Sequence, residues 1–230
     1  MFGPLKVKGI PPMITLYGVY RSRASRPLWL LAECGVEFTH VPVIQSYRLD
    51  QPKAPNAPFN TASPAFLAIN PIGQVPAMVD EGLVLSESLA ITLYIAQRYG
   101  GVVGPQSDAE GALMGQWALF AATALEGPAL EILNTAANAG GSAEGQANIA
   151  INAEKLRRPL ARLEKALTGA DWLVGGRFTV ADINTAECLR YAQSHPTLLG
   201  EFPAVKAWLE RAQARPAFKA MWEKRLAEPA

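Results

Sequence analysis

The sequence has few of the residues on which metal and disulfide chemistry depend. Its 230 residues include two cysteines, Cys34 and Cys188, and two histidines, His40 and His195. The cysteines lie far apart in apolar helical patterns and no CxxC occurs, which argues against a disulfide framework, a zinc site and a dithiol redox centre. The histidines are too isolated to bind a metal. We therefore expect no metal, and we interpret both histidines as surface or satisfied residues.

An excess of charge of either sign is also missing. The chain has 21 basic and 20 acidic residues and a formal charge of +1. A nucleic-acid-binding protein usually shows a clustered basic excess, so we expect no nucleic-acid partner. No window approaches the about eighteen uninterrupted apolar residues of a membrane span, and the first twelve residues lack the apolar core of a signal peptide. These absences predict a soluble, cytoplasmic protein with no membrane partner.

The first hundred residues alternate between strand and helix patterns. Met13–Tyr17 and Phe38–Val43 are short apolar runs that predict strands, and Pro42 favours a sheet edge for the second. Between them, apolar residues spaced as on a helix run from Leu28 to a stop at Gly35. Gln45–Ala62 contains three prolines and little periodicity, which predicts an unusually long loop.

A hairpin and another helix complete this half. Ser63–Ile69 predicts a short helix, and Ser86–Tyr99 a longer one that ends at two glycines. Ala77–Val79 and Leu83–Leu85 flank Asp80-Glu81-Gly82, a hairpin signal in which the glycine supplies a positive φ. This order predicts an α/β domain with a small mixed, four-stranded sheet covered by helices.

The remainder of the chain shows no strand-like alternation. Alanine and leucine dominate, and helices are expected over about residues 108–138, 143–168, 180–194, 204–214 and 216–226. Thr179 and Asp182 form a capping box, in which Asp182 reaches back to the amide of Thr179 at the start of a helix. We therefore expect an N-terminal extension (1–12), an α/β domain (13–101) and an all-α domain (108–230).

Two segments carry a family resemblance. Residues 70–79 read NPIGQVPAMV, and residues 83–91 read LVLSESLAI. The NPxGxVPA stretch, the hairpin and the Glu-Ser pair that opens a helix resemble the cytosolic glutathione-transferase family, and the Thr179–Asp182 cap extends the similarity to the rear half. The resemblance implies a thioredoxin-like front domain, a helical-bundle rear domain and a bacterial-like, serine-type member similar to the theta and beta classes.

The resemblance also implies a set of glutathione-binding residues. Val75-Pro76 would be a cis bond whose preceding backbone pairs with glutathione. Ser88 would bind the γ-glutamyl carboxylate, Glu87 the ammonium group, and Gln74 the glycine end. The amides at a helix N-terminus bind carboxylates readily, although Ser and Glu are also favoured there as plain caps.

The thiol-activating group is expected in the polar segment between the first strand and the first helix, YRSRASR (residues 20–26). Alignment of Arg26 with the family's serine-type motif places Ser22 in the catalytic position. Tyr20 and Ser25 are alternatives, and Tyr17 is a further rival. Three arginines in this segment make better sense if an anion binds there, because a helix N-terminus disfavours cations.

The expected reaction is conjugation, in which the glutathione thiolate attacks a hydrophobic electrophile, with glutathione as co-substrate and no other cofactor. Trp117 and Phe120, with Tyr20, would line the pocket for the second substrate, although aromatic residues at that spacing are more often core. The alternatives are glutathione-dependent reduction of disulfides or peroxides, lyase or isomerase chemistry on the same fold, and a non-catalytic binding module. The resemblance implies a homodimer.

Overall fold

The structure, a computed structural model, describes residues 14–229 and divides into two compact units. The first contains residues 14–101 together with 216–229, and the second contains residues 102–215. The division departs from the domains expected from the sequence, because the last helix belongs to the first unit. Its Phe218 ring packs edge-on against Trp29, with centroids 4.9 Å apart. The expected extension, residues 1–12, lies outside the described residues.

The first unit is built on a four-stranded mixed sheet in the order β2-β1-β3-β4. The strands are β1 (Thr15–Tyr17), β2 (Thr39–Val41), β3 (Ala77–Asp80) and β4 (Leu83–Ser86). β1 runs parallel to β2 and antiparallel to β3, and β3 and β4 form the expected hairpin. Gly82 at its turn has a φ of 86°. The thioredoxin-like prediction is confirmed, including the edge position of β2.

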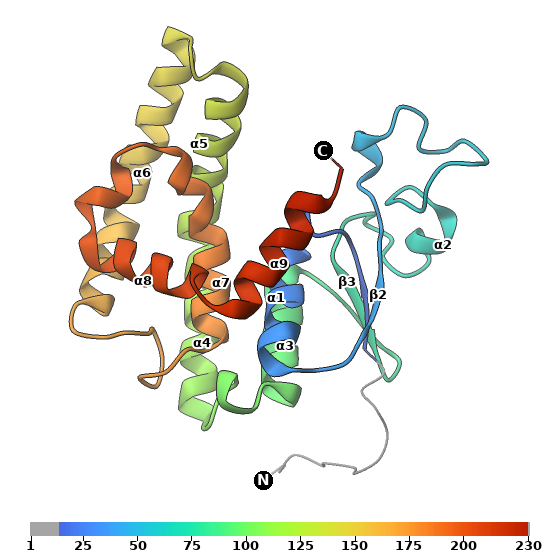
Figure 1. Ribbon diagram of the computed structural model, residues 1–230, viewed down its shortest axis with the longest axis horizontal. Coiled ribbons are helices and arrows are strands. Elements are labelled where there is room, and N and C mark those ends of the chain that lie inside the picture. Colours follow the sequence, from blue (N-terminus) through green and yellow to red (C-terminus); the bar gives the residue numbers. More distant parts are fainter. Residues whose placement is uncertain (1–13, 230) are drawn as a thin grey trace. The chain divides into compact units, whose positions relative to one another are not determined.

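Helices cover both faces of this sheet. They are α1 (Ser25–Cys34), α2 (Pro64–Leu67), α3 (Ser88–Tyr99) and α9 (Pro216–Ala227). In Figure 1, α1, α3 and α9 lie on one side of the sheet and α2 lies on the other. On the α2 side, Phe66 is buried in a cluster with Val43 and Ala77. The sheet therefore holds the β1–α1 turn and the start of α3 within one rigid framework.

The long segment 45–62 is ordered around one asparagine. It contains a short 3₁₀ helix, η1 (Ser46–Arg48), and an isolated bridge between Ile44 and Asn60. The Asn60 side chain is buried, and its amide donates to the carbonyls of Pro52 and Pro58 at 2.9 and 2.7 Å. A segment with only one short 3₁₀ helix is thus closed by hydrogen bonds from a single asparagine side chain.

The second unit is all-helical, as expected. It contains α4 (Asp108–Phe120), the π-helical turn η3 (Ala121–Leu125), α5 (Glu126–Ala139), α6 (Ala143–Leu167), α7 (Val180–Leu189) and α8 (Pro203–Gln213), with 3₁₀ helices η2 (Gly101–Val103) at its border, η4 (Arg190–Ser194) and η5 (Leu198–Glu201). The π turn interrupts the single helix expected over 108–138. Pro128 lacks an N–H, and in an unbroken α-helix its ring would meet the carbonyl of Ala124.

The central helix of this unit is α7, every residue of which is buried. The predicted cap at its start is present: the Thr179 N–H donates to Asp182 Oδ2 at 2.9 Å. The other oxygen of Asp182 accepts from Leu173 N and from Trp208 Nε1, at 3.1 and 2.8 Å. Asp182 therefore joins α7, the preceding loop and α8. Within residues 14–229 no helix is long and apolar enough to cross a bilayer.

Candidate active site

Ser22 lies in the turn between β1 and α1 and is half-buried. Its hydroxyl donates to the Val19 carbonyl at 2.6 Å and accepts from the Ala24 N–H at 3.0 Å. The helix begins at Ser25, so Ser22 precedes it, as the position of Pro27 in the first turn requires. The hydroxyl oxygen is thus fixed by a backbone donor while its proton is held by a single carbonyl.

The two alternatives to Ser22 are placed differently. Ser25 is fully buried at the first position of α1, so a ligand has no access to its hydroxyl. Tyr20 is half-buried, and its ring packs edge-on against His40 with centroids 5.3 Å apart. The third candidate, Tyr17, packs against Phe66 on the α2 side of the sheet. Ser22 and Tyr20 are thus both half-buried residues of the turn, and Ser25 is closed to a ligand.

Gly18 marks the point where this turn meets the segment before β3. Its φ is 143°, and a Cβ built on it would lie 2.7 Å from Ala24 Cβ, 3.4 Å from Val75 Cβ and 3.7 Å from Ser22 Oγ. Ser22 and Val75 therefore face the same small volume, which only a glycine leaves open. His40 supports the turn from the other side, because its Nε2 bonds to the Gly18 carbonyl at 2.7 Å.

The segment before β3 has the predicted cis bond between Val75 and Pro76. The buried side chain of Asn70 braces this loop by donating to the Gln74 carbonyl at 2.7 Å. The Gln74 side chain is exposed, and Val75 is half-buried. The loop thus presents Gln74 and Val75 to solvent from a fixed backbone.

Glu87 and Ser88 stand at the junction of β4 and α3. Glu87 has a φ of 68°, which is rare for a residue with a side chain, and its own side chain is exposed. Such backbone strain, of order 1–3 kcal/mol, is characteristic of ligand-binding positions. Ser88 is 5% exposed and accepts a hydrogen bond from Arg26 Nη1 at 2.9 Å.

The Arg26–Ser88 contact has a chemical consequence. A guanidinium has only donors, so the Ser88 oxygen accepts and its proton is free to be donated to a ligand. Arg26 is 1% exposed and also places a positive charge behind that hydroxyl. Both effects favour an anionic group at Ser88, the ligand type expected there.

The arginines of the turn make different contacts, and the binding of an anion beside them stays a prediction. Arg26 points to Ser88, Arg21 Nε donates to the Arg225 carbonyl at the end of α9 at 3.1 Å, and Arg23 is exposed. The sequence indicates Arg26 as a motif residue and as one of three arginines favouring an anion, but it does not reveal the contact with Ser88. Ser88 is 62 positions away on α3, and no spacing pattern reveals such a contact.

The native thiols are poor nucleophile candidates. Burial, with a smaller effect of the Glu33 charge, raises the pKa of Cys34 to about 12. Cys188 is buried in the helical unit, where its Sγ lies 3.5 Å from Glu126 Oε2. Neither cysteine forms a disulfide within the described residues. The described part of the chain has no cluster of three side chains suited to a metal ion.

Of the three aromatic residues proposed for the second-substrate pocket, Tyr20 belongs to the first unit, whereas Trp117 and Phe120 belong to the helical unit. Trp117 is 6% exposed, and its ring meets Phe120 edge-on at a centroid distance of 5.5 Å. The Arg162 guanidinium lies over both rings, at 5.3 and 4.5 Å from their centroids. Trp117 therefore has little surface to offer a ligand, while Phe120 is half-buried.

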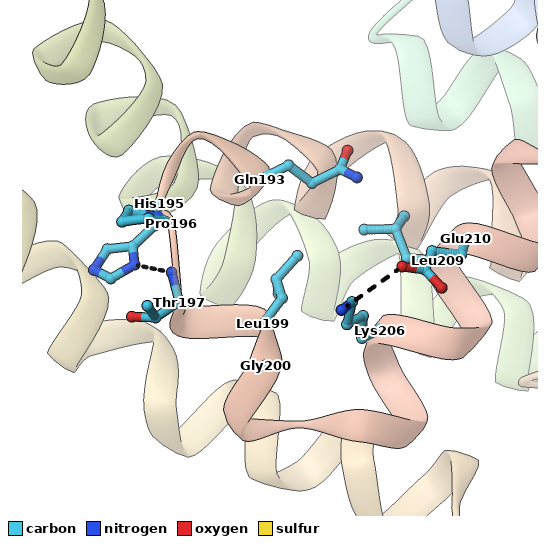
Figure 2. Close-up of a pocket in the computed structure, with 9 residues that line it drawn as sticks. All are labelled: Gln193, His195, Pro196, Thr197, Leu199, Gly200, Lys206, Leu209 and Glu210. Atoms are coloured by element: carbon cyan, nitrogen blue, oxygen red, sulfur yellow. Dashed lines mark hydrogen bonds and ion pairs between the residues drawn. The ribbon is translucent and has the colours of Figure 1, made fainter.

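The helical unit also has an open pocket of about 430 Å³ near η4, η5 and α8 (Figure 2). Its lining includes His195, whose Nδ1 accepts from the backbone N–H groups of Thr197 and Leu198 at 3.3 and 3.1 Å. Burial and the Arg157 charge lower the His195 pKa. His195 is thus a satisfied, neutral residue, and this pocket has no nucleophile paired with a base.

Comparison with known proteins agrees with these features. Residues 12–97 match the family described as glutathione S-transferase, N-terminal domain, and residues 114–216 match the C-terminal domain of the same family. The chain is 30% identical to glutathione S-transferase 1 of Triticum aestivum over 93% of its length and 91% of the relative's. It is 32% identical to glutathione S-transferase 3 of Zea mays, covering 94% and 92% of the two chains.

Solved structures are similar as well. Glutathione transferase F7 from Populus trichocarpa matches with a TM-score of 0.76 and 31% identity, over 92% of this chain and 99% of that one. A theta class glutathione S-transferase from Xanthomonas axonopodis pv. citri, with glutathione bound, matches with a TM-score of 0.74 and 31% identity, over 91% and 96%. This chain belongs to the glutathione S-transferase family.

Proposed function

We propose that this protein is a glutathione transferase that activates the glutathione thiol with Ser22 and transfers the sulfur to an electrophilic small molecule. The observation that carries the proposal is the meeting of Ser22 and Val75 around Gly18. A peptide held by the backbone at Val75 would place its thiol beside the Ser22 hydroxyl. Family membership and the two relatives named glutathione S-transferase support the same reaction.

The Ser22 hydroxyl is suited to this role because its proton can be redirected. Rotation about the Cβ–Oγ bond moves the proton from the Val19 carbonyl toward a thiolate, while the Ala24 N–H continues to hold the oxygen. A hydrogen bond to an ionised group contributes about 1.5–3 kcal/mol. A shift of two pKa units in a bound thiol requires about 2.7 kcal/mol, so this one bond supplies most of it. The thiol proton is released to solvent, the thiolate attacks the electrophile, a carbon–sulfur bond forms, and the leaving group departs with the electron pair of the broken bond.

Glutathione itself would be held by the first unit. Ser88, polarised by Arg26, and the α3 N-terminus would bind the γ-glutamyl carboxylate. Glu87 would bind the ammonium group, Val75 the peptide backbone and Gln74 the glycine end. Glutathione acts as a co-substrate in this scheme, and no residue is assigned to another cofactor.

The class within the family, the homodimer, the location and the nature of the electrophile are also proposals. The serine-type assignment rests on the position of Ser22 in the turn, and the theta- and beta-like assignment stays a prediction, although one similar structure, from Xanthomonas, is of the theta class. The curated relatives named above are plant proteins and give no support to a bacterial-like origin. A homodimer, a cytoplasmic location and a hydrophobic electrophile rest on family membership. Phe120 is a better candidate than the buried Trp117 for contact with that electrophile.

The test is a set of three variants. Ser22→Ala should keep affinity for glutathione but lower turnover by about 10- to 150-fold, which corresponds to loss of one charge-assisted hydrogen bond. Ser25→Ala and Tyr20→Phe are the matched controls and should retain turnover. Ultraviolet absorbance of the bound thiolate should disappear at neutral pH in Ser22→Ala alone. Unchanged turnover in Ser22→Ala would move the role to whichever control is impaired, and failure of the wild type to bind glutathione would refute the function itself.

A further inference from the structure

The C-terminal end of the chain is hydrogen-bonded to the turn that carries Ser22. The Glu228 carboxylate accepts from the backbone N–H of Tyr20 at 2.8 Å with Oε1, and from the N–H of Arg21 at 2.7 Å with Oε2. Arg225 Nη1 donates to the Tyr20 carbonyl at 2.5 Å. Arg21 Nε donates in return to the Arg225 carbonyl at 3.1 Å. These bonds join residues separated by more than 200 positions in the sequence.

The segment is well anchored to the first unit. α9 runs beside α1 in Figure 1, and its Phe218 and Met221 are buried. Phe218 packs against Trp29 of α1. Beyond α9, Arg48 Nη2 donates to the Pro229 carbonyl at 2.7 Å. Glu228 is therefore presented to the turn by an element with its own apolar contacts.

The main chain of the two residues before Ser22 is held almost entirely by this segment. Tyr20 and Arg21 have two N–H groups and two carbonyls, and three of these four groups bond to Glu228 or Arg225. The fourth, the Arg21 carbonyl, accepts from Gln45 Nε2 at 3.1 Å. A carboxylate that accepts from two successive amides forms two charge-assisted bonds at once, and so fixes the orientation of both peptide planes.

Resting on the proposed function, we propose that Glu228, assisted by Arg225, is a positioning residue for the Ser22 hydroxyl. The peptide plane between Tyr20 and Arg21 is the last but one before Ser22, so its rotation turns the Ser22 Cα–Cβ bond. A displacement of about 1 Å of a reacting group is enough to lower a rate about 100-fold. Thiol activation in this protein thus depends on a carboxylate from the opposite end of the chain.

The first test compares two glutamates of the same segment. Glu228→Ala should lower kcat/KM by about 10- to 100-fold, mostly through kcat, and raise the pKa of the bound glutathione thiol by about one unit. Glu223→Ala removes an exposed carboxylate from α9 itself and should match the wild type. Glu228→Gln should fall between them, because an amide has one acceptor oxygen and its NH₂ would face the second N–H. Arg225→Met should repeat the Glu228→Ala effect in weaker form.

A double-mutant cycle separates positioning from general weakening of the fold. If Glu228 acts through Ser22, Glu228→Ala should have almost no further effect on kcat/KM in a Ser22→Ala background. Additive losses, or a lower unfolding temperature with an unchanged thiol pKa, would overturn the proposal. Amide hydrogen exchange at Tyr20 and Arg21 gives a readout that needs no glutathione. Exchange there should accelerate in Glu228→Ala, and unchanged exchange would overturn the inference even if the wild type proved unable to bind glutathione.

Discussion

Replacement of Gly18 by alanine tests the geometry that brings Ser22 and Val75 together. The backbone at this position has a φ of 143°, a region that residues with a Cβ rarely adopt. The added methyl group would also lie 2.7 Å from Ala24 Cβ, closer than two carbon atoms approach. The substitution therefore introduces two separate penalties, one in the backbone and one in packing.

Their magnitudes follow from the structure. A residue held in a sparsely populated φ/ψ region costs about 1–3 kcal/mol, and an extra methyl group in a filled space costs about 1–3 kcal/mol. Gly18→Ala should thus lower the free energy of unfolding by about 2–6 kcal/mol. Relief of the overlap would push Ser22 and Val75 apart, so kcat/KM should also fall, by about 10- to 100-fold.

Gly82→Ala is the matched control. Gly82 also has a positive φ, 86°, but nothing lies within 4 Å of a Cβ built on it. Gly82→Ala should lower the free energy of unfolding only through backbone strain, by about 1–3 kcal/mol, and should keep the wild-type activity. Urea unfolding of both variants and the wild type measures the differences in the free energy of unfolding, and steady-state kinetics measure the activity. Equal stability of the two variants would refute the close approach at Gly18, and full activity of Gly18→Ala would refute its link to the site.

Two further predictions concern strain and protonation. Glu87→Gly should stabilise the fold by up to about 1 kcal/mol by relieving the φ of 68°, whereas Glu87→Ala should not. Both should weaken glutathione binding in calorimetry, and equal stability of the two variants would contradict the strain argument. Burial raises the pKa of Asp182 from 3.8 to about 6, against the hydrogen bonds from Trp208, Thr179 and Leu173, so the folded state holds this proton more tightly than the unfolded chain does. The stability that the raised pKa of Asp182 contributes is fully present below the unfolded pKa and is lost as the pH rises through about 6. Relative to Asp182→Asn, the wild type should lose about 2.4 kcal/mol between pH 4 and 7 in urea unfolding, and a difference independent of pH would contradict the shift.

Local patterns were sufficient to predict most of the fold. Strands, helices and the β3–β4 turn depend on hydrophobic periodicity and on residues such as Gly82, whose conformational preferences act within a few positions. The capping role of Asp182 toward Thr179 is local for the same reason, and it is present. The π turn before Pro128 is not predictable from the proline alone, because Pro159 lies inside α6 and that helix continues through it without a π turn.

The glutathione-transferase motifs also identified which segments form the candidate site, because Val75, Glu87 and Ser88 belong to recognisable short patterns. Those patterns do not show how deeply these residues are buried or which side chains they contact. Only the tertiary structure places Arg26 behind Ser88, buries Ser25 and leaves Ser22 half-buried. Each of these facts depends on contacts between elements far apart in the sequence, and side-chain burial is a property of the packed whole.

The motifs by themselves determined the class of this protein, two units with glutathione chemistry. The few cysteines and the balanced charge predict no metal and no nucleic-acid partner. The tertiary structure decided how the turn that carries Ser22 is held. From sequence, α9 was assigned to the helical domain, yet it packs against Trp29 and delivers Glu228 to the amides of Tyr20 and Arg21. A hydrogen bond between residues 208 positions apart leaves no periodic trace in the sequence, because it is formed only when the packing of α9 against α1 brings Glu228 next to Tyr20.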